Sequence, residues 1–301
     1  MKLSGVFTAL ATPFRDDLSL DERALASFVD WQISSGISGI VPCGTTGESA
    51  TLNFEEYCTV VRLCIETARG RILVIAGAGS HCTTETISRA LFVQSAGADA
   101  ALIVVPYYNR PSDEGVYQHF RAVHDATNIP IVLYNVPQRT AIDISNDTIR
   151  RIAELPRVVG IKDCTGAERA AVLRAMLPEK VAILSGEDET ALASYMNGGS
   201  GCISVVSNVA PKMAVELYRL HALGKINMAK QVSGNLAALS RVLFIEPSPS
   251  PTKYALSLMG KMRPKVRLPL VELTSSGQTA VKNVLETLDL LRQQKAMHSQ
   301  L

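Results

Sequence analysis

The chain has 301 residues, of which 47% are hydrophobic and 19% are charged, which is ample for one large domain or two ordinary ones. Its formal net charge of +2 and the lack of any basic run argue against nucleic acid as a partner, because such binding needs clustered Lys and Arg. The apolar stretch at the N-terminus is interrupted at Pro13, Arg15 and Asp16, before a signal peptide or membrane span could form. These features predict a cytoplasmic globular protein with small-molecule partners and no membrane association.

Eight apolar, β-rich runs alternate along the chain with segments of helical periodicity. The runs are residues 6–12, 39–43, 72–78, 101–108, 130–136, 158–164, 181–187 and 202–208. Helical segments such as 21–36 and 83–97 carry an apolar residue every three or four positions. Apolar strands joined by helices favour a parallel sheet covered on its outer side, and eight such units match a closed (β/α)8 TIM barrel.

An open doubly wound sheet is the structural alternative. Its dinucleotide-binding signal would be "GAGSHC" at 77–82, in which the third glycine is missing. Residues from about 210 onward show a helical pattern, broken by "EPSPSP" at 246–251 and "RPKVRLP" at 263–269. We therefore predict a (β/α)8 catalytic barrel over residues 1–225 and a helical C-terminal domain over residues 226–301.

The cysteines and histidines show no disulfide or metal-binding pattern. No CxxC pair is present, and His119 and His124 do not share a helix face well enough to bind one metal. Cys43, Cys164 and Cys202 lie near expected strand ends, which keeps a nucleophilic thiol as an alternative to a reduced core residue. No metal or cofactor is predicted.

Polar residues gather where the expected strands run into their loops, which is where a (β/α)8 barrel places its active site. They include Thr45, Thr46, Glu48, Tyr107, Tyr108, Asn109, Tyr134, Asn135, Arg139, Lys162 and Asp163.

Lys162 directly follows the apolar stretch "VVGI" and should project toward the mouth of the barrel. Because burying an unpaired ammonium is costly, we expect either an ion pair, with Asp163 or Glu187, or a functional amine. An amine with the ordinary lysine pKa, near 10.4, is almost fully protonated at pH 7, so an apolar site that lowers the pKa would activate it. Such lysines form imines with carbonyl substrates.

An imine mechanism also needs a group that moves protons, and Tyr134 on the neighbouring strand is placed to do this. Hydroxyls of Thr45 and Tyr108 could relay its proton. In "GTTGES" at 44–49, one threonine would then serve the relay, while Thr46 and backbone amides would hold a carboxylate. The alternative is ordinary turn chemistry, in which a threonine caps the following helix.

The motifs "GTTGES" at 44–49, "PYYNRP" at 106–111, "YNVPQRT" at 134–140 and "GIKDCTG" at 160–166 closely resemble those of the dihydrodipicolinate synthases. The resemblance covers nearly the whole chain. These synthases belong to the wider family of pyruvate-dependent class I aldolases, which also includes N-acetylneuraminate lyase. The resemblance implies a (β/α)8 barrel, a helical C-terminal domain and a homotetramer built as a dimer of dimers. It also implies condensation of pyruvate with L-aspartate 4-semialdehyde to 4-hydroxy-tetrahydrodipicolinate, in lysine and diaminopimelate biosynthesis, without a metal or cofactor.

Carried over by position, the resemblance makes Lys162 the amine that forms an imine with pyruvate and Tyr134 the proton donor and acceptor. Thr45 and Tyr108 would complete the relay, with Tyr108 coming from a neighbouring subunit. These four residues are the expected catalytic set.

The expected substrate-binding residues are Thr46, Arg139, Gly186 and Ile203. Thr46 and backbone near Ile203 would bind the pyruvate carboxylate, and Gly186 would line the pocket. Arg139 would bind a second carboxylate, for which a planar guanidinium is suited, whereas sugar-acid aldolases of the family generally lack it. Ser248 stands where the synthases often have asparagine, so an N-acetylneuraminate or keto-deoxy sugar-acid lyase is the alternative. A non-catalytic metabolite-binding protein is a further one.

Many bacterial and plant relatives are inhibited by L-lysine, which binds a separate cleft between two subunits. The corresponding positions are Ser49, Ala50, Phe54, Tyr57, His81, Glu85 and Tyr107. Phe54 and Tyr57 stand where the enterobacterial pattern has histidines, and His81 stands where it has asparagine. An aromatic side chain at 54 can still cover the ligand, and Tyr57 and His81 keep hydrogen-bonding capacity. We expect partial inhibition by lysine; the alternative is that these are ordinary interface residues.

Overall fold

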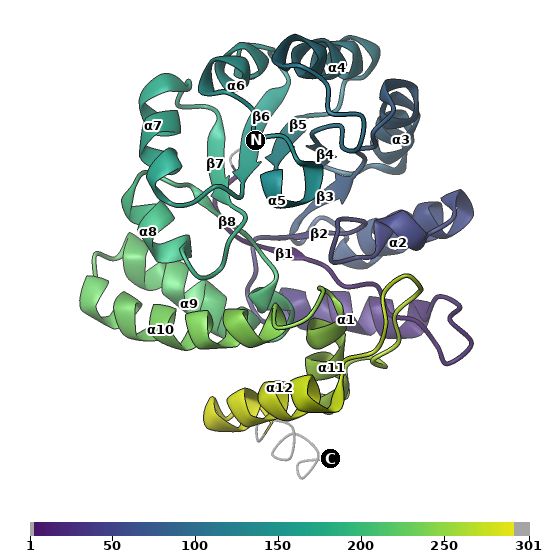
Figure 1. Ribbon diagram of the computed structural model, residues 1–301, viewed down its shortest axis with the longest axis vertical. Helices are drawn as coiled ribbons and strands as arrows, with labels where there is room; N and C mark the ends of the chain where they lie inside the picture. The colour runs from purple at the N-terminus through teal and green to yellow at the C-terminus, as the bar shows by residue number, and fades with distance from the viewer. Residues whose placement is uncertain (1–2, 292–301) are drawn as a thin grey trace.

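The computed structural model describes residues 3–291, and Figure 1 shows strands enclosed by helices. Within that range eight parallel strands are hydrogen-bonded in sequence order, and the eighth pairs with the first. The strands are β1 (Gly5–Ala9), β2 (Gly39–Val41), β3 (Leu73–Gly77), β4 (Ala100–Val104), β5 (Ile131–Asn135), β6 (Val158–Asp163), β7 (Ala182–Ser185) and β8 (Gly201–Ser204). The predicted (β/α)8 barrel is confirmed, and the open doubly wound sheet is wrong.

Apart from the four-residue α5 (Pro137–Thr140), whose Arg139 lines the cavity at the mouth of the barrel, the helices between the strands form its outer layer. In chain order, the helices between the strands are α1 (Glu22–Ser34), α2 (Phe54–Ala68), α3 (Thr83–Ala96), α4 (Asp113–Ala126), α5 (Pro137–Thr140), α6 (Asn146–Ala153), α7 (Glu168–Met176) and α8 (Ala191–Met196), with a short 3-10 helix, η1 (Ser49–Thr51), before α2. The expected helices at 21–36 and 83–97 correspond to α1 and α3. Asp21 caps the first of them, and Gly97 ends the second with φ of 90°.

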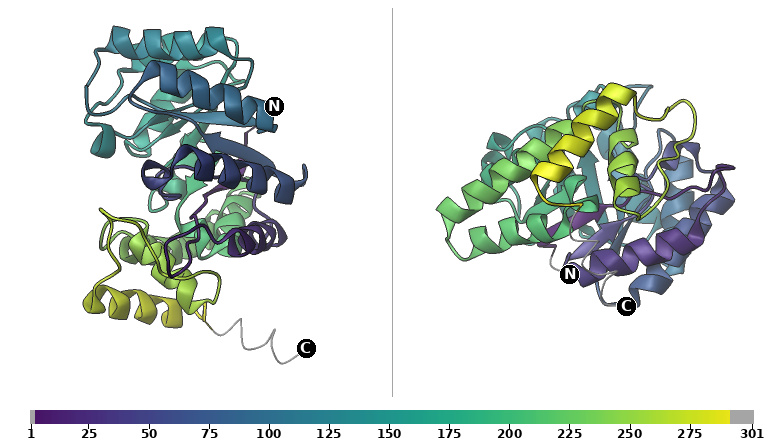
Figure 2. Two further views of the ribbon diagram at one scale, coloured as in Figure 1. Left: turned by 90° about the vertical axis from the view of Figure 1, so that its right-hand side faces the viewer. Right: turned by 90° about the horizontal axis from the view of Figure 1, so that it is seen from below.

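The C-terminal part of the chain is helical. Its elements are η2 (Val206–Asn208), α9 (Pro211–Ala222), α10 (Ile226–Leu243), α11 (Ser250–Leu258) and α12 (Ser275–Thr287). Figure 2 shows α11 and α12 at one end of the molecule, beyond the barrel. The expected break at 246–251 is too long, because α11 begins at Ser250 and accepts Pro251 in its first turn. The division into residues 1–225 and 226–301 stays a prediction, and residues 292–301 lie outside the described range.

Two apolar runs extend four residues past the strands they predicted, further than the other six. Run 101–108 stops being a strand after Val104. Run 202–208 stops after Ser204, where the chain enters η2. Here the buried carboxylate of Asp188 accepts the backbone N–H groups of Val205 at 2.8 Å and Val206 at 3.0 Å, which ends the strand ladder. An apolar pattern records burial and does not by itself mark this change of backbone direction.

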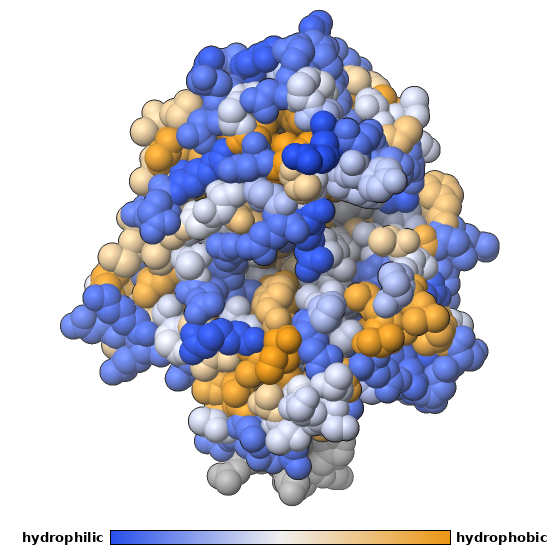
Figure 3. Space-filling view, viewed as in Figure 1, coloured by the Kyte–Doolittle hydropathy of each residue, from blue (hydrophilic) through white to orange (hydrophobic). Residues whose placement is uncertain are grey.

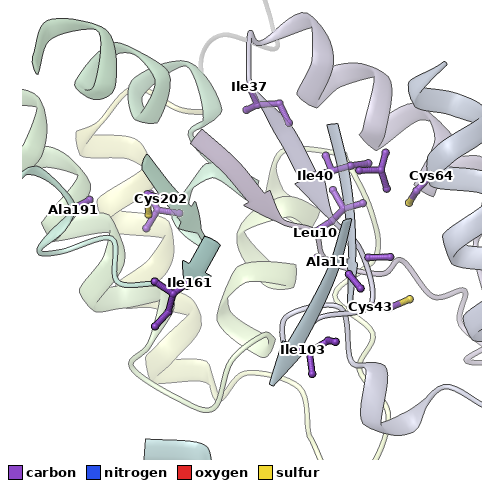
Figure 4. Close-up of a cluster of buried hydrophobic side chains, with 14 of the residues drawn as sticks. Leu10, Ala11, Ile37, Ile40, Cys43, Cys64, Ile103, Ile161, Ala191 and Cys202 are labelled. Atoms are coloured by element: carbon purple, nitrogen blue, oxygen red, sulfur yellow. The ribbon is translucent and has the colours of Figure 1, made fainter. Parts of the chain in front are cut away.

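Apolar side chains fill two layers, because successive strand residues face opposite sides of the barrel wall. Val41, Tyr134 and Leu184 belong to the inner cluster. Ile40 and Ile161 belong to the larger outer cluster between strands and helices, part of which Figure 4 shows. The surface in Figure 3 is mainly hydrophilic, with separate apolar patches. None of the helices within residues 3–291 is long and apolar enough to cross a membrane.

Candidate active site

Lys162 and Tyr134 lie side by side on neighbouring strands. They are register partners in the β5–β6 ladder, and the Lys162 Nζ atom is 4.3 Å from the centre of the Tyr134 ring. Ile161 packs outward in the large cluster, so strand alternation turns Lys162 inward. Its side chain is buried, with 6% of the residue's surface exposed. Two strands thus place an amine and a phenol together at the carboxyl end of the barrel.

A cavity of about 680 Å³ opens over this pair. Its lining includes Gly44, Thr45, Thr46, Tyr134, Gln138, Arg139, Lys162, Cys164, Gly186, Glu187, Glu189, Thr190, Val205, Ser240, Arg241, Phe244 and Ser248. Six of the eight expected catalytic and substrate-binding residues line this cavity, and the exceptions are Tyr108 and Ile203. Thr45, Thr46, Arg139 and Gly186 do line the cavity, as expected.

The turn at 44–49 holds the two threonines at the cavity wall, with Thr45 exposed and Thr46 buried. The alternative that a threonine caps the following helix is wrong. Asn53 caps α2 instead, in a capping box with Glu56. Neither threonine is therefore needed to begin the helix.

Gly186 and Ile203 differ in their relation to the cavity. A side chain at Gly186 would place its Cβ atom 2.1 Å from the Cys164 Sγ atom and 3.0 Å from the Lys162 Cε atom, so this close approach requires glycine. Ile203 is fully buried in the inner cluster and does not line the cavity; Val205 does. The role of the backbone near Ile203 stays a prediction.

The charge state of Lys162 departs from the expectation. Burial is the largest influence and lowers its pKa, but attraction from Tyr134, followed by Cys164, Cys202 and Asp188, outweighs burial and raises the pKa above the ordinary lysine value. The expectation that an apolar site lowers the pKa of Lys162 is therefore wrong. Imine formation then needs a path that carries the ammonium proton away from Lys162, and the phenol of Tyr134 lies beside the amine.

The ion-pair alternative for Lys162 is wrong. Within residues 3–291 Lys162 forms no salt bridge. Asp163 instead accepts a hydrogen bond from Asn135 at 2.9 Å and lies 3.9 Å from Arg169. The amine therefore faces the cavity without a carboxylate in contact.

A nucleophilic thiol is also disfavoured. Burial raises the pKa of Cys164 to about 11, and it raises the pKa values of Cys43 and Cys202 well above that of an ordinary thiol. These thiols stay protonated at neutral pH, and a protonated thiol is a poor nucleophile.

Tyr108 lies outside the cavity of its own chain. It is 92% exposed, and its φ of 73° lies in the left-handed region that tyrosine rarely adopts. Within one subunit the structure does not bring Tyr108 to Lys162. This placement is compatible with the expected role in a neighbouring subunit, which stays a prediction.

A second cavity, of about 560 Å³, adjoins the first and shares Thr45, Tyr134 and Arg139 with it. Five of the expected effector positions line it, namely Ser49, Ala50, His81, Glu85 and Tyr107. The rings of His81 and Tyr107 are 5.4 Å apart.

Two expected effector residues do not line this second cavity. Phe54 is half exposed and stacks against Tyr57. Tyr57 is buried, and its hydroxyl donates to the Gly77 carbonyl at 2.8 Å. The Tyr57 hydroxyl proton is therefore already used inside the protein, and a contact between Tyr57 and a ligand stays a prediction.

Several residues at the cavity were not expected from the sequence. Arg241 from α10 and Glu189 form a salt bridge of 2.8 Å, and both line the cavity with Ser240 and Phe244. Glu187, which the sequence suggested only as an ion-pair partner of Lys162, is half-buried, and burial is the main cause that raises its pKa. Periodicity could not have found the α10 residues, because they follow no strand and reach the site through helix packing.

Comparison with known proteins accords with this geometry. A model of the dihydrodipicolinate synthetase family matches residues 2–288. The chain is 99% identical, over the full length of both chains, to 4-hydroxy-tetrahydrodipicolinate synthase of Anaplasma marginale (strain Florida). The chain belongs to the dihydrodipicolinate synthetase family.

Solved structures agree with this assignment. A chloride-inhibited dihydrodipicolinate synthase from Acinetobacter baumannii, complexed with pyruvate, has a TM-score of 0.93 and 42% identity, covering 95% of this chain and 98% of that one. The enzyme from Cyanidioschyzon merolae with lysine bound has a TM-score of 0.92 and 33% identity, covering 96% and 99%. The predictions of the family, of an aldolase-type lyase and of the synthase function are confirmed.

Proposed function

We propose that the chain condenses pyruvate with L-aspartate 4-semialdehyde through an imine on Lys162, to give 4-hydroxy-tetrahydrodipicolinate for lysine and diaminopimelate biosynthesis. The observation that carries the proposal is the Lys162 amine beside the Tyr134 phenol at the base of the first cavity, where no carboxylate of residues 3–291 forms a salt bridge with it. The pyruvate complex of the Acinetobacter baumannii relative supports the first substrate. The names of the similar synthases support the second.

The first half of the reaction forms the imine. Tyr134 and the hydroxyl of Thr45 relay the ammonium proton away, and the neutral amine attacks the ketone carbon of pyruvate. The resulting carbinolamine receives a proton on its hydroxyl through the same relay and loses one water. Thr46 donates to the pyruvate carboxylate, and Tyr108 of a neighbouring subunit completes the relay.

The second half forms the carbon–carbon bond. Loss of a proton from the pyruvyl methyl group gives an enamine, whose carbon attacks the aldehyde, and the new alkoxide takes up a proton. Arg139 lines both cavities and forms no salt bridge within residues 3–291, so its guanidinium is available for the carboxylate of the semialdehyde. The amino group of the adduct then attacks the imine carbon, closes the ring and releases the Lys162 amine.

We expect the active form to be a cytoplasmic homotetramer built as a dimer of dimers. The exposed Tyr108, held in a left-handed conformation, supports a subunit contact that buries it. The sedimentation coefficient and light-scattering mass measure the assembly. A fully active monomer would contradict the role given to Tyr108.

A coupled assay with pyruvate and aspartate semialdehyde tests the synthase activity. The rate is compared with the rates at which the protein cleaves N-acetylneuraminate and keto-deoxy sugar acids. We expect turnover only in the synthase direction, because Arg139 suits a carboxylate and not a polyol. Preferential cleavage of a sugar acid would contradict the proposal and favour the lyase alternative. Absence of both activities would favour a metabolite-binding protein.

L-Lysine is a candidate effector at the second cavity, as the lysine-bound relative supports. Glu85 is the natural partner for a ligand ammonium, although Arg89 already contacts one of its oxygens at 2.5 Å and Ser80 donates to the other at 2.6 Å. These hydrogen bonds, the Ser80 one first, lower the pKa of Glu85 and keep it ionised. Competition with Arg89 predicts weak, partial inhibition.

Calorimetric titration of lysine, with and without pyruvate, tests the effector. Coupling between two sites is reciprocal, so pyruvate should change lysine affinity by the factor by which lysine changes pyruvate affinity. Glu85→Gln should lose the inhibition and keep turnover. No heat of binding at millimolar lysine, together with unchanged turnover, would contradict the effector role and leave the synthase activity unaffected.

A further inference from the structure

Glu48 lies in the same turn as Thr45 and Thr46, and its carboxylate is buried against the C-terminal part of the chain. Its Oε1 atom accepts a hydrogen bond from the Lys253 Nζ atom at 2.6 Å, and neither side chain is exposed. Its Oε2 atom accepts the backbone N–H of Arg267 at 3.0 Å. Lys253 belongs to α11 and Arg267 follows that helix, so one carboxylate joins the threonine turn to two C-terminal segments.

Phe14 extends this contact. The Lys253 Nζ atom lies 4.1 Å from the centre of its ring, and the Arg267 guanidinium carbon lies 4.3 Å from it. Arg267 also donates to both carboxylate oxygens of Glu56, at 2.5 and 2.7 Å, at the start of α2. Lys253 and Arg267 therefore contact the segment between β2 and α2 at Glu48, and Arg267 also contacts the start of α2 at Glu56.

The turn needs such support because its backbone is strained. Glu48 has φ of 54°, in the left-handed region that favours glycine and is costly for glutamate. Its N–H donates to the Thr45 carbonyl at 3.1 Å, so a shift of Glu48 moves the catalytic threonine directly. The Thr12 hydroxyl donates to the Gly47 carbonyl at 2.7 Å and fixes the other side of the turn.

A buried ion pair is a weak source of stability, and apolar side chains of similar volume would join the two segments at least as well. A carboxylate that accepts from two fixed donors instead restricts the position of the turn more narrowly than apolar contact does. We propose that Glu48, held by Lys253 and Arg267, is a positioning residue that sets the Thr45 and Thr46 hydroxyls for imine formation. The inference rests on the proposed function for the roles of the two threonines.

The test compares rates of imine formation, measured by borohydride trapping of pyruvate on Lys162 at timed intervals and expressed per folded site. The main variant is Glu48→Gln with Lys253→Met, which removes both buried charges at nearly constant volume. Glu48→Asp keeps the charge and shortens the side chain by one methylene. It tests the same role of Glu48 if the double variant does not fold. Lys265→Met is the matched control, because Lys265 pairs with Glu272 at the surface of the same C-terminal region.

We expect imine formation to slow at least about tenfold in the double variant and in Glu48→Asp, since small misplacement of positioned groups is costly in rate. The KM for the semialdehyde should change less than about twofold, because Arg139 lies outside the turn. The Lys265→Met rate should equal that of the wild type. A wild-type rate per folded site in Glu48→Asp would overturn the inference. Failure of the proposed function would appear differently, as wild-type protein that traps pyruvate and makes no condensation product.

Discussion

Lys162 and Lys253 are both buried, one at the end of β6 and one in α11, yet their surroundings shift their pKa values in opposite directions. Burial is the largest influence on Lys253 and lowers its pKa to about 8, although Glu48 opposes the shift. The pKa of Lys162 is raised. A search for perturbed lysines alone would therefore select Lys253 as the nucleophile. The cavity identifies Lys162 instead, because its amine faces the cavity. Lys253 is enclosed by the Glu48 carboxylate and by the side chains of Phe14 and Arg267.

The largest effect should follow removal of the cavity lysine. Lys162→Met should lower turnover at least about ten-thousandfold, because no other lysine within residues 3–291 lines the cavity and could form the imine. Borohydride with pyruvate should add a reduced pyruvyl group to Lys162 in the wild type and none in the variant, as read by mass spectrometry. Labelling of Lys253 in the wild type would contradict the assignment of Lys162 as the nucleophile.

Removal of the enclosed lysine should act on stability. Lys253→Met leaves the Glu48 carboxylate buried without its partner, which should lower the free energy of unfolding by about 3 to 5 kcal/mol. Urea unfolding measures the loss. Lys265→Met, at a partly exposed pair, should cost less than about 1 kcal/mol. Equal losses in the two variants would show that burial of the pair does not matter.

Arg139 should distinguish the second substrate from pyruvate within the cavity that holds Lys162. Arg139→Ala should lower kcat/KM for the semialdehyde about a hundredfold and leave imine formation with pyruvate within about threefold, since its proposed partner is the second substrate. Arg263→Ala, at a surface ion pair with Asp16, is the control and should change neither step. Equal damage to both steps would mean that Arg139 organises the site as a whole.

His119 shows the effect of burial on a pKa by itself. In Lys162 and Lys253, attraction to neighbouring groups opposes that effect. Burial alone lowers its pKa from 6.5 to about 4. The unfolded chain therefore binds more protons between these two pH values, so stability is present above pH 6.5 and is lost as pH falls toward 4. Wild-type protein should lose about 2 kcal/mol more than His119→Gln between pH 7 and 4.5, by urea unfolding. Equal losses would exclude His119 as the cause.

The barrel and most of the residues at its mouth can be predicted from the sequence alone. Apolar runs of strand length alternate with helical periodicity, and parallel strands in sequence order leave few other folds. Lys162 and Tyr134 were predictable as neighbours because residues at the ends of adjacent strands must meet. Thr45 and Arg139 follow from the same rule, since each lies just past a strand.

Other features of the site depend on contacts between distant segments, which the local sequence pattern does not encode. The direction of the Lys162 pKa shift depends on charges from four other residues, and the buried state of Tyr57 depends on packing against β3. Lys253 meets Glu48 across 205 positions of the chain. Such contacts arise because helices beyond the barrel fold back onto its loops, and no periodicity within either segment records where the other will lie.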